Sequence, residues 1–80
     1  MVIIKETQYL VFEELPTKTK TKYITVTNKR SQDIIGEIKW YGSWRQYCFF
    51  PEFDTVWNNG CLTDVLEVIN TLMEDRKKSK

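Results

Sequence analysis

Eight of the chain's eleven aromatic residues lie within the eighteen residues from Trp40 to Trp57. This segment also contains Arg45, so aromatic rings and a guanidinium group are close together along the chain. Rings of this kind stack on nucleobases, at about 1–3 kcal/mol per base, and arginine binds phosphate or carboxylate through two parallel hydrogen bonds. The same residue types also dominate the energetics of protein–protein interfaces. The segment therefore predicts a binding site, either for a nucleotide-like ligand or for a partner protein.

A tight turn at Gly42-Ser43 would make the surrounding residues a β-hairpin, and the register of a hairpin decides which side chains share a face. A two-residue turn places Trp40, Arg45 and Tyr47 on one face, together with Ile34, Gly36, Ile38 and Phe49. The opposite face receives Lys39, Tyr41 and Trp44, together with Ile35, Glu37, Gln46, Cys48 and Phe50. A turn longer by one residue would reverse the faces on one strand. The predicted ligand-binding residues are Trp40, Tyr41, Trp44, Arg45, Tyr47 and Lys39.

The groups that commonly carry catalysis are missing or isolated. The chain has no histidine, so Cys48 and Cys61 have no imidazole to activate them as nucleophiles. Glu13 and Glu14 are adjacent in a predicted strand, where neighbouring side chains point to opposite faces. The three glycines are far apart, which excludes a glycine-rich phosphate loop. We expect no enzyme activity, no cofactor and no metal site.

Length and composition restrict the protein class further. Eighty residues form one domain, and a hydrophobic fraction of 41% with 14% aromatics is too rich for a disordered chain. The net charge of +1 provides no overall field to attract nucleic acid or an anionic membrane. Only two cysteines, no signal peptide and no apolar run long enough to span a membrane predict a cytoplasmic protein with reduced thiols.

The hydrophobic pattern predicts strands before a single helix. Strand-like segments cover residues 8–15, 22–28, 34–41 and 44–50, and residues 55–57 could add a fifth strand. An apolar stripe at spacings of three and four then predicts a helix over residues 61–76, followed by a disordered basic tail at 77–80. The stripe consists of Leu62, Val65, Leu66, Ile69, Leu72 and Met73. We therefore expect a single α+β domain, a two-layer fold whose four- to five-stranded antiparallel sheet is covered on one face by the C-terminal helix.

Positive charge is concentrated in two places. Five lysine or arginine residues and no acid lie between Lys18 and Arg30, and threonine alternates with lysine from Thr17 to Lys22. This alternation predicts an exposed hairpin or edge strand whose lysines prevent edge-to-edge pairing, and the alternative is an arm that contacts phosphate. The basic C-terminal tail complements the helix dipole and favours solubility, with a nucleic-acid patch as the alternative.

The residues from Trp40 to Pro51, read as W-Y-x-x-W-R-x-Y-x-F-x-P and followed by a C-terminal helix, resemble small uncharacterised proteins of phages and mobile elements. The resemblance covers roughly residues 34–73. It implies a phage-like origin, in which small non-enzymatic proteins often inhibit host factors or sequester signalling nucleotides.

We therefore predict a non-catalytic anti-defence inhibitor that sequesters a nucleotide-like signalling ligand at the aromatic and arginine residues. One alternative is an inhibitor that docks its aromatic hairpin on a host enzyme, and a second is a single-stranded nucleic-acid binder, which the near-neutral net charge disfavours. Because so small a domain encloses a ligand poorly, we also expect a homo-oligomer with the ligand site at a subunit interface.

Overall fold

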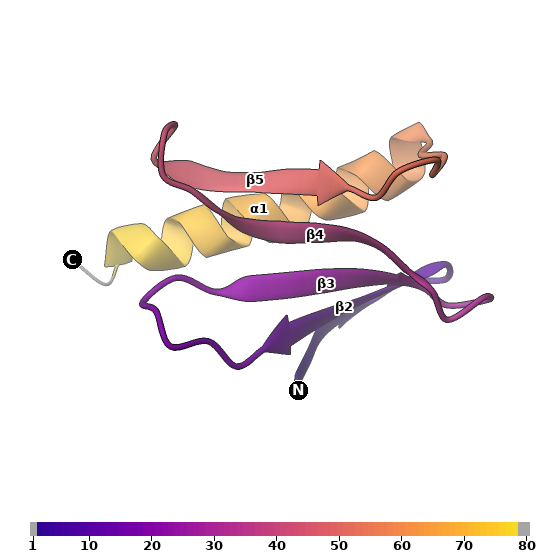
Figure 1. Cartoon of the computed structure of the whole chain (residues 1–80), viewed down its shortest axis with the longest axis horizontal. Coiled ribbons are helices and arrows are strands. Elements are labelled where there is room, and N and C mark those ends of the chain that lie inside the picture. Colours follow the sequence, from indigo (N-terminus) through magenta and orange to yellow (C-terminus); the bar gives the residue numbers. More distant parts are fainter. Residues whose placement is uncertain (1, 79–80) are drawn as a thin grey trace.

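Five strands form one antiparallel sheet in which every strand pairs with its neighbours in the sequence. A computed structural model describes residues 2–78. The sheet order is β1-β2-β3-β4-β5, and one helix follows (Figure 1). The elements are β1 (Val2–Glu6), β2 (Leu10–Leu15), β3 (Tyr23–Asn28), β4 (Ile34–Tyr41), β5 (Gln46–Pro51) and α1 (Asn59–Lys78). The predicted α+β fold with an antiparallel sheet and one C-terminal helix is confirmed.

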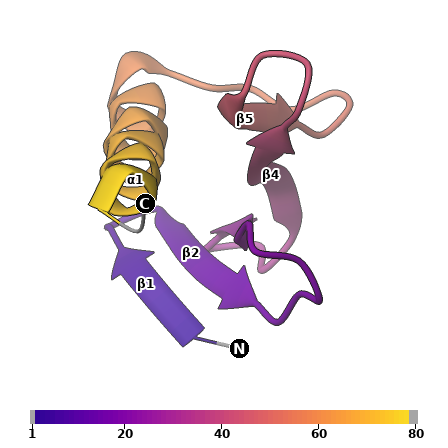
Figure 2. The same cartoon turned by 90° about the vertical axis from the view of Figure 1, so that its left-hand side faces the viewer.

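The core lies between the curled sheet and the helix. Viewed along the long axis, the sheet bends around one side of the molecule and α1 lies across its open side (Figure 2). Alternate residues of the central strands point to the helix, as the twofold side-chain period of a strand requires. Fully buried side chains are Leu10, Phe12, Ile24, Val26 and Ile38. Burial of each such side chain contributes about 1.5–3 kcal/mol, so this face of the sheet supplies much of the stability.

The helix begins with an N-cap residue, and its buried face is rotated from the predicted stripe. The Asn58 side-chain oxygen accepts a hydrogen bond from the Cys61 backbone N–H at 2.8 Å, which is the geometry of an N-cap. Val65, Val68 and Leu72 are the buried helical residues. Leu62 and Leu66, which the spacing places in the buried stripe, are exposed by 47% and 55%. They lie on the flank of the helix, because spacings of three and four from Val65 lead to Val68 and Leu72.

Strand β1 is not predicted by the hydrophobic pattern. Its residues pair antiparallel with β2, with an irregularity between Ile3 and Lys5. The Lys5 ammonium group forms an ion pair with Glu67 of the helix, which joins β1 to α1. Residues 55–57, the candidate fifth strand, form no strand. The apolar start of the chain therefore provides the fifth strand, at the opposite edge of the sheet from β5.

A β-bulge corrects the placement of two isoleucines. The register between β3 and β4 shifts at Val26/Thr27, where Val26 pairs with Gly36 and Thr27 pairs with Ile34. One step along β3 therefore corresponds to two residues of β4, and this bulge exchanges the faces to which Ile34 and Ile35 point. Ile35 therefore packs against the core, and Ile34, predicted to face the helix, is 54% exposed.

The threonine–lysine segment is a loop between β2 and β3 rather than a strand. The Thr17 hydroxyl donates to the backbone carbonyls of Thr19 and Thr21, at 3.2 and 3.0 Å. Threonine side chains that bond nearby carbonyls in this way compete with strand pairing. The segment is therefore the exposed, hydrogen-bonded loop of the β2–β3 hairpin, and the predicted edge strand is wrong.

At the other end of the chain, the helix begins two residues before the predicted start and continues two residues beyond the predicted end. Lys77 and Lys78, predicted to lie in a disordered tail, belong to α1, whereas Ser79 and Lys80 lie outside the described residues. Within the described part of the chain, no helix has the length and apolar character needed to cross a membrane.

Candidate functional site

The turn that carries the aromatic residues is two residues longer than predicted. Tyr41 pairs with Gln46 and Trp40 pairs with Tyr47, so Gly42, Ser43, Trp44 and Arg45 form the turn. Every predicted pair between β4 and β5 therefore shifts by two residues. Because side chains alternate with a period of two, this shift leaves the assigned faces of β4 and β5 unchanged beyond the bulge. The position of Arg45 differs most, since it lies in the turn with a left-handed φ of 53°.

On the helix side of the sheet, Trp40 meets residues from the end of α1. The Arg76 guanidinium lies over the Trp40 ring, 4.1 Å from the ring centroid, in a cation–π contact. Next to this pair is a hollow of about 530 Å³, which is lined by Trp40, Gly42, Arg45, Met73, Arg76 and Lys77. We call this hollow the Trp40 pocket. It combines one indole with three cationic side chains, so its chemistry suits an anionic ligand that carries an aromatic ring.

Tyr47, one of the predicted ligand-binding residues, is part of the core. It is only 5% exposed, and its ring meets the edge of Trp40 at a centroid distance of 5.3 Å. Its hydroxyl oxygen accepts a hydrogen bond from the Lys22 backbone N–H at 3.0 Å. Tyr47 thus packs against the Trp40 ring and joins β5 to the loop before β3.

Removing the Tyr47 hydroxyl tests this structural role. We expect Tyr47→Phe to lower the free energy of unfolding by about 1 kcal/mol, because the Lys22 N–H loses its partner while the ring remains. Urea denaturation of the two proteins measures the difference. A variant as stable as the wild type would show that this hydrogen bond contributes nothing.

The other three predicted residues lie on the opposite side of the sheet. The rings of Tyr41 and Trp44 meet edge to face with centroids 5.0 Å apart, and Tyr41 also approaches Phe50 at 6.1 Å. The Lys39 ammonium lies 4.7 Å from the Phe50 centroid. The structure therefore divides the six predicted residues into two groups, and only Trp40 and Arg45 line the Trp40 pocket.

The helical residues of the Trp40 pocket are absent from the predicted set. Arg76 and Lys77 lie near the basic end of the chain, where the sequence predicts a complement to the helix dipole, with a nucleic-acid patch as the alternative. The helical period gives a signal that identifies Arg76, because it follows Leu72 by four residues and Met73 by three. Arg76 therefore continues the face of the helix that packs toward the sheet.

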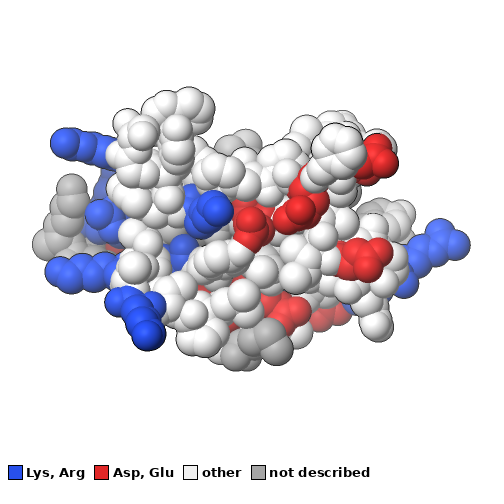
Figure 3. Space-filling view, in the orientation of Figure 1, with Lys and Arg blue, Asp and Glu red and all other residues white. Residues whose placement is uncertain are grey.

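Basic side chains from three separate segments gather at one end of the molecule. The turn with Arg45, the end of α1, and the loop that carries Lys18, Lys20 and Lys22 lie together at this end (Figures 1 and 2). In the space-filling view, blue side chains are concentrated at the left, whereas most of the red side chains lie in the centre and at the right (Figure 3). The near-neutral net charge thus hides a strong separation of charge along the molecule.

The Trp40 pocket is lined mainly by aromatic and cationic side chains. Among residues 2–78, no group of three or more histidine, cysteine, aspartate or glutamate side chains is placed to hold a metal ion. Both cysteines are free thiols of intermediate burial. The groups that the Trp40 pocket offers a ligand are therefore its indole and its cationic side chains.

Comparison with known proteins finds one informative relative. The chain is 38% identical over 76 residues to a protein of Acholeplasma phage L2 described as an "Uncharacterized 9.3 kDa protein". The match covers 94% of this chain and 97% of the phage protein. No family model matches the chain, and no solved structure matches it.

Proposed function

This chain belongs to the family of the 9.3 kDa protein of Acholeplasma phage L2, and we propose that it acts as a phage protein by binding a small molecule. We propose that this ligand is nucleotide-like and binds at the Trp40 pocket. We further propose that the protein acts without catalysis, as an inhibitor of host defence that holds a signalling nucleotide away from its receptor.

The observation that carries the proposal is the Arg76 guanidinium held over the Trp40 ring. One face of a guanidinium can stack on an indole while the other stacks on a base. Arg45 and Lys77 line the same pocket, where they can neutralise phosphate groups attached to that base. A nucleotide requires this combination of a stacking surface and neighbouring positive charges.

Isothermal titration calorimetry against cyclic mono-, di- and trinucleotides tests the proposal. We expect one of these classes to bind, and we expect Arg76→Ala to weaken that binding at least about tenfold, since it removes both the stacking plane and one of the pocket's positive charges. Arg30→Ala is the matched control, because it removes the same charge from an exposed residue in the turn between β3 and β4.

The proposal fails if the folded wild-type protein releases no heat with any of these nucleotides. It also fails if the two arginine variants bind equally well, because the site would then lie elsewhere. Circular dichroism of both variants distinguishes loss of binding from loss of the fold.

Single-stranded nucleic acid is a second candidate, which the lysine loop favours. The loop that carries Lys18, Lys20 and Lys22 lies at the same end of the molecule as the β4–β5 turn and the end of α1 (Figure 1), and these two segments line the Trp40 pocket. A backbone that follows these lysines while a base stacks in the pocket would make several phosphate contacts. Fluorescence anisotropy of a labelled oligonucleotide separates the two candidates, since only polyanion binding weakens steeply as salt is raised.

A further inference from the structure

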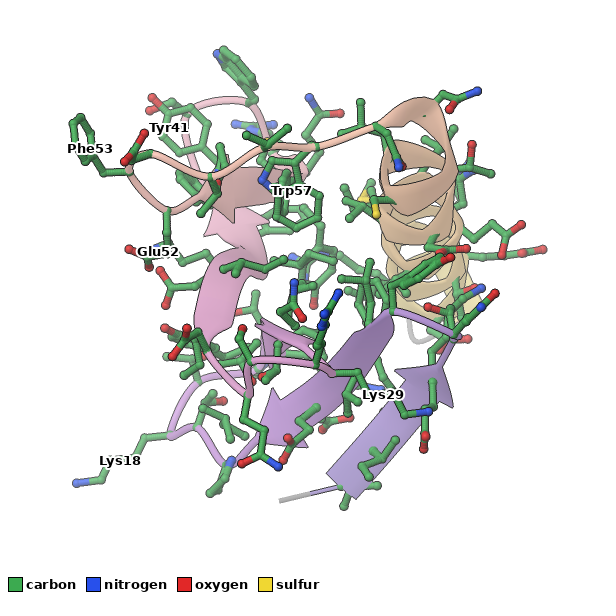
Figure 4. The ribbon with its side chains drawn as sticks, turned by 90° about the vertical axis from the view of Figure 1, so that its right-hand side faces the viewer. Lys18, Lys29, Tyr41, Glu52, Phe53 and Trp57 are labelled. Atoms are coloured by element: carbon green, nitrogen blue, oxygen red, sulfur yellow. The ribbon has the colours of Figure 1, made fainter. Side chains whose placement is uncertain are left out.

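The outer face of β4 and β5 exposes large aromatic side chains at both of its ends. Trp44 is 66% exposed and Tyr41 37% at one end, and Phe53 is 96% exposed at the other. Tyr41, Glu52 and Phe53 lie on the same side of these strands, whereas Trp57 and the helix lie on the other side (Figure 4). We call this surface the outer aromatic face. Exposed aromatic groups of this size mark interaction surfaces more often than isolated apolar residues do.

Phe53 is held in place by the loop that carries it. The Glu52 backbone N–H donates to the Ile35 carbonyl at 3.0 Å, which fixes the start of the loop to β4. The Thr55 hydroxyl donates to the Glu52 carbonyl and accepts from the Trp57 indole N–H, both at 2.9 Å. A loop whose backbone is already held by hydrogen bonds loses little conformational entropy on binding, so the segment that carries Phe53 is suited to an interface.

Between the two aromatic ends lies a pair of opposite charges. Lys39 and Glu37 are two residues apart on β4, so both point to the outer face, and their charged atoms are 3.9 Å apart. Tyr41 lies two residues beyond Lys39 on β4. In the other direction, beyond Glu37, the backbone carbonyl of Ile35 accepts the hydrogen bond that holds the Phe53 loop. Along β4 the outer aromatic face therefore has the order aromatic, positive, negative, aromatic, and Phe50 of β5 lies beside the two charges.

The outer aromatic face of one copy is complementary to the same face of a second copy that runs in the opposite direction. A rotation of 180° about an axis that lies in the plane of the outer face, across the strands and between Lys39 and Glu37, places a second copy face to face with the first. This rotation brings Lys39 of one copy over Glu37 of the other. The same rotation brings Phe53 of one copy over Tyr41 and Trp44 of the other. A surface with this property forms an isologous dimer, in which every contact occurs twice.

We infer that the outer aromatic face binds a second copy of this chain across such a two-fold axis. Lys39 of each copy pairs with Glu37 of the other, and Phe53 of each copy packs on the Tyr41–Trp44 pair. The self-complementary order of charges is the observation that favours a second copy of this chain as the occupant. The interface leaves the Trp40 pocket free, since that pocket lies on the helix side of the sheet.

Analytical ultracentrifugation over a concentration series tests the inference. We expect a reversible dimer of the wild-type chain, and we expect Phe53→Ser and Trp44→Ser each to raise the dimer Kd at least about tenfold, since buried aromatic residues dominate such interfaces. Leu66→Ser is the matched control. It removes an apolar side chain that is 55% exposed on the helix, and it should leave the Kd unchanged.

Exchanging the charges gives a sharper test that does not depend on the aromatic residues. Lys39→Glu places two like charges opposite each other at both symmetric contacts, and Glu37→Lys does the same with positive charge. Each variant alone should be largely monomeric, because like charges across an interface are unfavourable. An equimolar mixture of the two variants should form a heterodimer, since each new glutamate then faces a new lysine.

A wild-type chain that stays monomeric at every concentration overturns the inference and leaves the outer aromatic face to a different protein. A dimer that the aromatic and charge variants do not weaken, or a mixture that does not restore it, also overturns it. Arg76→Ala should dimerise normally, so failure of nucleotide binding and failure of dimer formation are separate results.

Discussion

Replacing Phe12 with alanine is expected to lower the free energy of unfolding by about 3–5 kcal/mol, the range for removing a buried aromatic ring from a core. Phe12 is fully buried at the centre of β2, where it pairs with Val26 and faces the helix. Neither β2 nor β3 can close the resulting cavity by moving alone, because each is hydrogen-bonded to a strand on both sides. Since small domains have only 5–15 kcal/mol of stability in total (about 0.1 kcal/mol per residue), this loss threatens folding itself.

Urea denaturation measures the effect, and Phe53→Ala is its matched control. The control removes an identical ring that is 96% exposed, so its stability should change by less than about 0.5 kcal/mol. The protein is kept dilute in these experiments, because dimer formation would otherwise add to the apparent stability. Equal losses in the two variants would contradict the placement of the core.

Replacing Gly36 with alanine is expected to cost about 1–3 kcal/mol, the typical range for overpacking. A Cβ atom at this position would lie 2.5 Å from Phe49 Cε1 and 3.3 Å from Trp57 Cζ2. The Phe49 ring cannot swing away freely, because Trp57 packs against it with centroids 4.6 Å apart. The clash therefore has to move both rings together.

Gly42→Ala is the control for this experiment. A Cβ atom at Gly42 would meet no other atom within 4 Å, and Gly42 does not adopt a positive φ, so alanine should be tolerated there. Thermal or urea unfolding of the two variants gives the comparison. Combining Gly36→Ala with Phe49→Leu should recover part of the loss, since the smaller side chain gives the new methyl group room. A Gly36→Ala protein as stable as wild type would show that the rings adjust at no cost.

Local sequence patterns were sufficient to predict most of the fold. The alternation in residues 22–28 and the helical spacing after Asn58 identified β3 and α1, and the alternation of side chains placed Trp40 and Tyr41 on opposite faces of β4. The pattern does not predict strand β1, because its three consecutive apolar residues show no alternation. The bulge that exchanges Ile34 and Ile35 has no local sequence signal, since it depends on how β4 meets β3.

The candidate site could be predicted only in part, because its residues come from distant parts of the chain. Trp40 and Arg45 are near each other in the sequence and were identified together. Arg76 reaches Trp40 only because the helix lies along the sheet, and no spacing along the chain reports that contact. Tyr47 was identified by its residue type, but its burial is a property of the packed structure.

The nearest-neighbour order of the strands has a consequence for how the protein is made on the ribosome. Each strand can pair with the one just synthesised, and short connections make such pairings fast. The helix that covers the apolar face is translated after all five strands. The nascent sheet therefore emerges with its core side uncovered, and this period before α1 docks is when aggregation and proteolysis compete most strongly with folding.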